Sequence, residues 1–348
     1  MPKPIELLPY EMINHERPSV AIRVLIFGAT GTIGQATVRA LIAGGYHVTC
    51  VRRAATTTED LTTTRDEFAQ SSSSQWLIGD ITEPTSLERD VFAGRRFDIV
   101  ISCLASRTGA PKDAWRIDYY AHHHILNAAM QAGVRHFILV SAICVQKPLL
   151  GFQCAKLAFE DELSQSGIVY SIVRPTAFFK SLSGQIDRIL KGKSFLMFGD
   201  GQLTRCKPIS DDDLGCYLVS CIDDQSKWNC VLPIAGPGDA ITPLQQGHYL
   251  FSKLGLKPKF KMIPISLITI ISNILSFLGR FNSRMYGLAE LAKIAHYYAT
   301  ESMLVLNTST GQYDPDITPS TGSDTLFEYY DGLLGGEFRH QRSDHSIF

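Results

Sequence analysis

The sequence predicts an α/β protein with a Rossmann-type doubly wound parallel sheet and a smaller C-terminal substrate or lid domain. In residues 22–53, IRVLIFGATGTIGQATVRALIAGGYHVTCVRR, a buried β-branched run, a glycine-rich turn, a helical pattern and a second apolar run follow one another. Apolar runs of strand length then alternate with helical patterns as far as Pro175, and this alternation is typical of parallel sheets. Beyond Pro175 the alternation weakens, which indicates a different C-terminal part.

Each element of the first half has its own signal. Strands are expected where short apolar, β-branched runs occur, at 24–27, 47–51, 76–80, 97–105, 136–143 and 169–175. The first helix ends at Gly44-Gly45, and further helices are expected near 85–91, 115–132 and 153–166. The Thr/Ser-rich stretch 54–75 predicts an exposed connection.

The second half is less regular. Residues 191–210 are interpreted as a hairpin and loop, and 211–222 as a helix capped by Asp211 or a neighbouring aspartate. Helices and long loops are expected from Thr242 onward.

Composition restricts the class of protein. The 348 residues are 45% hydrophobic and 19% charged, as in a folded domain, and the net charge of −1 predicts no attraction to nucleic acid. The 8 cysteines show no CxxC pair, so reduced core thiols are expected and no metal site. The triple histidine 122–124 and the triple aspartate 211–213 are likewise not expected to bind metal, because consecutive helical residues point apart and aspartates cap helix starts.

The chain shows no signal or transit peptide, which predicts a cytoplasmic protein. Its most apolar segment, Met262–Arg280, contains Pro264 and Asn273 and is interpreted as a buried or partly exposed helix. Because this segment is so apolar, peripheral contact with a membrane is a second interpretation. The oligomeric state is also left open.

The turn GATGTIG predicts a dinucleotide site. Gly28, Gly31 and Gly34 allow a tight turn and close backbone approach to a pyrophosphate. Thr30, Thr32 and Ile33 lie in the same turn, where the following helix offers free N–H groups to that anion. The position between a predicted strand and helix supports this interpretation over a purely structural turn.

Two arginines end the second strand. An NAD enzyme usually has an acidic residue here for the ribose 2′-hydroxyl, whereas Arg52 and Arg53 suit a 2′-phosphate. The sequence therefore predicts NADPH as the cofactor, the alternative being two solvated surface arginines.

Further cofactor contacts are predicted at the carboxyl ends of later strands, where ligands of open parallel sheets bind. These candidates are Asp80, Ile81, Leu104, Ala105 and Ser141, and the apolar ones among them can equally be ordinary core.

The segment VRPTAFFKS ends the strand at 169–175. The backbone from Pro175 through Thr176 to Phe178 is predicted to meet the nicotinamide amide. Phe178 and Phe179 are candidates to wall an apolar substrate pocket, although paired aromatics after a strand are also common in cores.

Five segments carry a resemblance to a known family. They are GATGTIG, LVSAICVQKPLLGFQCAKLAFEDEL, YSIVRPTAFFKSLSGQ, FGDGQLTRCKPISDDDLGCYL and ESMLVLNTSTGQYDPDITPSTGSDTLFEYY. With these, the chain resembles the extended and atypical short-chain dehydrogenase/reductase superfamily and, within it, the NADPH-dependent divinyl chlorophyllide a 8-vinyl reductases, over about residues 22–332. The resemblance implies reduction of the C8 vinyl group of a Mg-tetrapyrrole, divinyl chlorophyllide or protochlorophyllide, to ethyl in (bacterio)chlorophyll synthesis.

The resemblance also assigns Lys156 and Phe152. Lys156 matches the superfamily lysine that binds the nicotinamide ribose hydroxyls, and it is the predicted catalytic residue. Phe152 stands where the superfamily usually has tyrosine, so the tyrosine's role is not transferred. The alternative for Lys156 is a surface lysine that faces Glu160 one turn later.

The missing phenol is consistent with vinyl reduction. A ketone reductase needs an acid beside one oxygen. Hydride addition to the outer carbon of a conjugated vinyl group instead spreads the charge into the macrocycle, and the inner carbon is protonated afterwards. Phe152 is therefore interpreted as a substrate contact. The alternatives are an NADP(H)-binding redox sensor without turnover and an isoflavone-reductase-like reductase of another conjugated alkene.

The sequence is divided accordingly. Residues 1–20 are an N-terminal extension and 21–235 the NADP-binding Rossmann domain, of which 176–205 contribute to the substrate cleft. Residues 236–335 form the C-terminal substrate or lid region, and 336–348 a disordered tail.

Overall fold

Seven parallel strands form the main sheet, in the spatial order β3-β2-β1-β4-β5-β6-β8. The computed structural model describes residues 22–54 and 74–336. The predicted N-terminal extension, most of the Thr/Ser-rich connection and almost all of the predicted tail lie outside these residues. The strands are β1 (Arg23–Phe27), β2 (His47–Arg52), β3 (Ser74–Ile78), β4 (Ile99–Ser102), β5 (His136–Val140), β6 (Val169–Pro175) and β8 (Cys230–Ile234). The predicted doubly wound α/β fold is confirmed, with its switch of direction between β1 and β4.

Six of the seven strands were predicted. β6 has the predicted bounds, and the other five differ from the prediction in start or length. The strand that sequence reasoning missed is β8, which contains Pro233. Proline cannot donate a ladder hydrogen bond, so it argues against a central strand. β8 pairs with β6 alone and forms the edge of the sheet, where a proline is tolerated.

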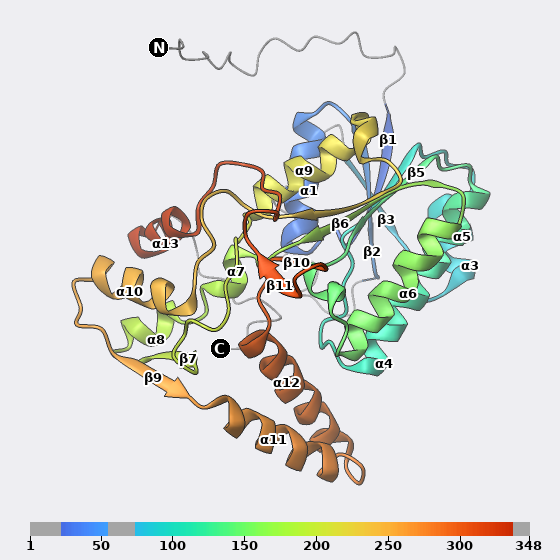
Figure 1. Ribbon diagram of the computed structural model, residues 1–348. Coiled ribbons are helices and arrows are strands. Elements are labelled where there is room, and N and C mark those ends of the chain that lie inside the picture. The colour runs from blue at the N-terminus through green and yellow to red at the C-terminus, as the bar shows by residue number, and fades with distance from the viewer. Residues whose placement is uncertain (1–21, 55–73, 337–348) are drawn as a thin grey trace, which may run out of the picture.

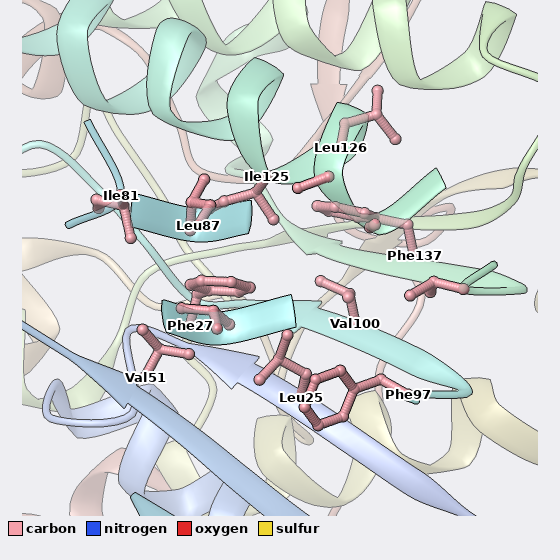
Figure 2. Close-up of a cluster of buried hydrophobic side chains, with 14 of the residues drawn as sticks. Leu25, Phe27, Val51, Ile81, Leu87, Phe97, Val100, Ile125, Leu126 and Phe137 are labelled. Carbon is pink, nitrogen blue, oxygen red and sulfur yellow. The ribbon is translucent and has the colours of Figure 1, made fainter. Parts of the chain in front are cut away.

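Helices cover both faces of the sheet (Figure 1). The helical elements of this half are α1 (Thr32–Ala43), α3 (Pro84–Ser86) with the π-helical η2 (Leu87–Phe92), α4 (Pro111–Ala114) with the π-helical η3 (Trp115–Ala121), α5 (His122–Gln131), the 3₁₀ turn η4 (Ile143–Gln146), α6 (Gly151–Gln165), α9 (Asp211–Asp223) and the 3₁₀ turn η5 (Gln225–Lys227). On one face, strand residues such as Phe27 and Phe137 pack against Leu87, Ile125 and Leu126 (Figure 2).

The other face of the sheet is covered by α1 and α9, which pack closely together. A Cβ added at Gly215 of α9 would lie 2.8 Å from the carbonyl carbon of Ala36 in α1. Ser210 is the N-cap residue of α9, and its hydroxyl accepts a hydrogen bond from the N–H of Asp213, so the expected aspartate cap is wrong. Arg39 and Asp212 then form an exposed ion pair between the helices, with 2.6 Å between Nη2 and Oδ1.

The elements after β6 build a second cluster beside the sheet. They are α7 (Phe179–Leu182), α8 (Ile186–Leu190), β7 (Phe195–Phe198), α10 (Pro243–Lys253), β9 (Phe260–Ile263) and α13 (Leu326–Gly335). The predicted hairpin in 191–210 is wrong, because β7 pairs in parallel with β9, a strand more distant in sequence. The remaining elements are α11 (Ile265–Leu278), α12 (Ser283–Thr300), β10 (Val305–Asn307) and β11 (Gln312–Asp314).

Among the described residues, no helix has both the length and the apolar character needed to cross a membrane. α11 and α12 pack on each other and extend away from the sheet (Figure 1).

We predict that Gly215→Ala lowers the free energy of unfolding by about 1–3 kcal/mol, because the added methyl group must push α9 away from α1. Urea denaturation measures this change. Gly287→Ala in α12 is the matched control, since nothing lies within 4 Å of its added Cβ. There we expect a gain of up to about 1 kcal/mol from helix propensity. Equal effects of the two substitutions would contradict the close packing.

Candidate functional site

The glycine turn between β1 and α1 leaves no room for side chains at two positions. Gly28 has φ +78°, and a Cβ there would lie 2.8 Å from the carbonyl oxygen of Cys103 at the end of β4. A Cβ at Gly34 would lie 2.1 Å from the carbonyl oxygen of Gly28. These contacts hold the turn tightly against the switch point of the sheet, and the N–H of Gly31 donates to Gly28 across it at 3.0 Å.

The start of α1 keeps its N–H groups available. Gly31 is the N-cap residue and has no side-chain cap, and the first turn holds no acidic residue. Thr30 is exposed, whereas Ile33 packs partly into the core below the turn. This helix start combines unpaired donors with the positive end of a helix dipole, so it suits an anion.

Lys180 is a residue that sequence reasoning missed. It lies in α7, and its Nζ donates to Oγ1 of Thr32 at the glycine turn, at 3.2 Å. Asp211 is nearby, and burial raises the pKa of its carboxyl to about 6, while the positive charge of Lys180 works against that rise. The only sequence signal was a lysine five residues after Pro175. The segment after β6 thus adds a positive charge to the glycine turn.

Arg52 and Arg53 lie where β2 ends. The Nε of Arg52 is buried and has no hydrogen-bond partner in the described part of the chain. Arg53 is exposed. A buried guanidinium nitrogen without a partner is unusual in a folded protein and marks a place where an anion would be accepted.

Asp80 and Ile81 lie beyond the end of β3. Oδ1 of Asp80 accepts hydrogen bonds from the Thr82 hydroxyl at 2.7 Å and from the Thr82 N–H at 2.9 Å. These bonds, and to a smaller degree the charge of Arg53, lower the pKa of the Asp80 carboxyl. Ile81 is part of the core cluster. At the end of β4, Leu104 is half-buried and Ala105 is exposed.

Lys156 forms a buried ion pair with Asp118. Its Nζ lies 3.0 Å from Oδ1 of Asp118, and the two side chains are only 10% and 0% exposed. Asp118 comes from η3, and the same oxygen also accepts from the N–H of Ser106 at 3.3 Å. Its second oxygen, Oδ2, has no partner within the described ranges. The carboxylate therefore fixes the lysine head at the inner side of α6.

The sequence offered Glu160 as an alternative partner for Lys156, but Glu160 binds other residues in the structure. It accepts hydrogen bonds from Arg174 of β6 and from the hydroxyl of Ser141 at the end of β5. The Ser141 side chain is buried and turned toward α6. Two buried ionic contacts, one turn apart on α6, thus tie this helix to its neighbours.

Phe152 lies in an apolar cluster at the start of α6. The partly buried members around it include Ala142, Ala177, Ile294 and Tyr298. Ile294 and Tyr298 come from α12, so the C-terminal part of the chain supplies one wall of this cluster. Burial raises the pKa of Tyr298 well above its usual range, which keeps the phenol protonated.

Polar contacts fasten this C-terminal wall to the segment after β5. Gln146 donates to the carbonyl of Leu304 at 2.6 Å and accepts from the N–H of Leu306 at 2.8 Å. Lys147 pairs with Glu301 at 2.7 Å. In addition, the hydroxyl of Tyr297 donates to the carbonyl of Cys144 at 2.8 Å.

The segment after β6 divides its side chains between two clusters. Pro175 ends the strand, and the hydroxyl of Thr176 donates to the carbonyl of Lys207 at 2.5 Å. Phe178 packs partly against the sheet core. Phe179 is buried in the second cluster, with its ring centroid 5.5 Å from that of Tyr329. Of the two phenylalanines expected to wall a pocket, Phe179 therefore lies within the protein interior.

Comparison of the sequence with known proteins shows which family the chain belongs to. A family model described as NAD(P)H-binding matches residues 28–225. The chain is 44% identical to the divinyl chlorophyllide a 8-vinyl-reductase of Zea mays over 334 residues, 93% of this chain and 83% of the maize protein. The chain belongs to the divinyl chlorophyllide a 8-vinyl-reductase family. The Arabidopsis thaliana member is also 44% identical, over 92% of this chain and 80% of its own length.

The fold extends more widely than this family. A complex of leucoanthocyanidin reductase with NADPH from Vitis vinifera superposes with a TM-score of 0.66 at 14% identity. The match covers 90% of this chain and 99% of that chain. At this identity the likeness shows a shared fold alone.

The glycine turn fits the NAD(P)H cofactor of the family. Gly28 and Gly34 leave the turn free of side chains, the start of α1 offers N–H groups, and Arg52 has a buried nitrogen without a partner in the described residues. The sequence prediction of a dinucleotide domain is thus confirmed, and the roles of its single residues remain proposals.

We predict that Arg52→Gln raises the Kd for NADPH by about 10- to 100-fold and changes the Kd for NADH less than about threefold. A charged hydrogen bond to the 2′-phosphate contributes roughly 1.5–3 kcal/mol, and NADH lacks this group. Fluorescence titration with both nucleotides measures the two constants. Arg96→Gln, an exposed arginine before β4, should change neither. An equal loss for both nucleotides would contradict the assignment.

We also predict that Asp118→Asn lowers the free energy of unfolding by about 3 kcal/mol, since it leaves the buried Lys156 ammonium without its counter-charge. NADPH binding should weaken in the same variant. Urea denaturation and NADPH titration test both effects. Asp212→Asn is the control, because its ion pair with Arg39 is exposed and contributes little. If both variants had the same stability, the buried pair would not position Lys156.

Proposed function

We propose that this chain reduces the 8-vinyl group of divinyl chlorophyllide to an ethyl group with NADPH. The observation that carries the proposal is the 44% identity to named vinyl reductases over 93% of the chain, a span that includes both Lys156 and the C-terminal wall at Phe152. The preference for NADPH over NADH is supported by the buried Nε of Arg52, which has no hydrogen-bond partner among the residues that the structure describes. Protochlorophyllide remains within the same substrate class.

The proposed reaction adds one hydride and one proton across the vinyl double bond. Bound NADPH supplies the hydride, which goes to the outer vinyl carbon. The electron pair of the double bond then lies on the inner carbon and is delocalised into the macrocycle, until that carbon takes a proton. Because the charge is spread over a large π system, no donor beside a single oxygen is required.

Lys156 is proposed to hold the nicotinamide ribose through its ammonium protons. Its pairing with Asp118 at 3.0 Å holds the lysine head in place on α6. A lysine fixed in this way positions the cofactor and stabilises negative charge nearby. The glycine turn and Lys180 would hold the pyrophosphate, and Arg52 the 2′-phosphate.

Phe152 and its apolar neighbours are proposed to contact the flat macrocycle. Ala142 and Ala177 are small members of this cluster, and Ile294 and Tyr298 from α12 belong to it as well. Aromatic and small apolar side chains suit a broad conjugated ring, since they offer area and exclude water without demanding hydrogen bonds. In this assignment the C-terminal region confers substrate specificity, while the sheet edge holds the cofactor.

The direct test mixes purified protein with divinyl chlorophyllide a and either NADPH or NADH, and follows the pigments by mass spectrometry. We expect a gain of two hydrogens with NADPH and a much slower reaction with NADH. Lys156→Met should lower kcat/KM by about 100-fold or more, since it removes the contact that orients the cofactor. Lys112→Met, on the exposed start of α4, is the control.

Two results would contradict this proposal. NADPH binding without turnover of any divinyl pigment would favour a redox sensor of the same fold. Reduction of a different conjugated alkene, with no activity on the divinyl pigment, would favour a reductase of another substrate class.

A further inference from the structure

Most of the exposed residues of α11 are apolar, and the exceptions are Ser266, Thr269 and Asn273. Its exposed large side chains recur at the spacing of one helix face and continue into the turn after the helix. They form an apolar stripe of seven residues, each 42–80% exposed: Leu267, Ile270, Ile271, Ile274, Phe277, Leu278 and Phe281. Contiguous apolar surface of this kind is rare on a protein that contacts only water, and it marks an interaction site.

α11 carries apolar side chains on its buried side and on its exposed side. Its buried positions include Ile268 and Ser272, so a serine faces α12 while isoleucines face outward. α12 also has two exposed leucines, Leu288 and Leu291. Packing within the hairpin therefore leaves the apolar stripe of α11 uncovered.

The hairpin is fixed at one end only. The last turns of α12 join the apolar cluster at Phe152, and Tyr297 bonds to Cys144. The two helices extend from this base, with the turn between them at the far end (Figure 1). The stripe is thus held away from the sheet on a rigid support.

The charged residues that flank α11 in the sequence, from residue 240 to 289, are all basic. No Asp or Glu occurs from Ala240 to Ala289. Lys257, Lys259 and Lys261 precede α11 and are exposed, and Arg280 follows it. None of these four forms an ion pair with any residue that the structure describes. Arg280 lies over the ring of Phe277, with its guanidinium carbon 6.0 Å from the ring centroid.

We propose that the α11–α12 hairpin docks on the surface of an anionic lipid bilayer. The apolar stripe enters the boundary between headgroups and acyl chains, and the flanking lysines and Arg280 meet lipid phosphates. α11 has 14 residues, about 21 Å of helix, which is too short for a hydrocarbon core of about 30 Å. The helix therefore lies in the interface. This inference goes beyond the proposed reaction and does not depend on it.

Charge argues against a second copy of the chain as the occupant. A two-fold contact through the stripe would place the same surface patch on both sides. The lysines before α11 would then approach the same basic region of the partner, with no acidic residue between 240 and 289 to balance them. A negatively charged bilayer satisfies both the apolar stripe and the basic flanks.

The test is flotation of the full chain with two kinds of vesicle, pure phosphatidylcholine and the same lipid with roughly a third phosphatidylglycerol. Ile270→Ser/Ile274→Ser removes two stripe residues that are each 55% exposed. Leu190→Ser/Val231→Ser is the matched control, at 58% and 44% exposure away from the hairpin. Lys259→Glu/Lys261→Glu tests the charge. Urea denaturation and NADPH titration verify that each variant is folded.

We expect wild type and control to float with the anionic vesicles, and the partition coefficient of the stripe variant to fall by about tenfold or more. The charge variant and high salt should remove the preference for anionic lipid. Failure of the wild type to bind either vesicle would overturn the proposal. So would equal binding to both vesicles, or a stripe-dependent dimer in sedimentation, which would make a second copy the occupant.

Discussion

The buried ion pair between Lys156 and Asp118 constrains this site more than any other contact. Lys156 has left water almost completely, and Asp118 supplies its counter-charge at 3.0 Å. Burying the two charges costs desolvation free energy, and separating them would leave an uncompensated charge in the interior. η3 and α6 must therefore keep their positions relative to each other. One turn along α6, Glu160 is held by Arg174 and Ser141, which ties the same helix to β5 and β6. The lysine is thereby presented at a fixed point beside the carboxyl ends of the strands.

Two groups of contacts complete the site around Lys156. On the cofactor side, the glycine turn lies against the end of β4, and Lys180 reaches it from the segment after β6. On the opposite side, α12 and the chain after it close on Phe152 and are fastened through Gln146, Lys147 and Cys144. The C-terminal region thus has two roles in our account: its base forms part of the substrate wall, and its free hairpin presents an apolar stripe to the surroundings.

The local parts of this structure were predictable from the sequence, and the parts that depend on distant partners were not. The glycine turn and β6 follow from short-range patterns, and they occur at the expected residues. β8 was missed because Pro233 argues against a strand unless its position at the sheet edge is known. The pairing of β7 with β9 joins residues too far apart for any local pattern.

The site shows the same division. The resemblance to a family identified Lys156, but the sequence suggested Glu160, one helical turn away, as its alternative partner. The actual partner, Asp118, is brought by a different helix. Lys180 lay inside a segment already chosen for its phenylalanines, yet only the fold turns it toward Thr32. For Phe179 a pattern of paired aromatics could not distinguish a pocket wall from the core, in which it lies.

The central claim is that this site reduces a conjugated vinyl group without a phenol at position 152. The most direct test compares kcat/KM for divinyl chlorophyllide between wild type and Phe152→Tyr, with NADPH binding measured in parallel. Our account predicts that the tyrosine variant binds NADPH normally and is no faster than wild type, because the charge formed in the reaction is not concentrated on one atom. A rate increase of about tenfold or more would show that a proton donor at this position is limiting, and would contradict the account.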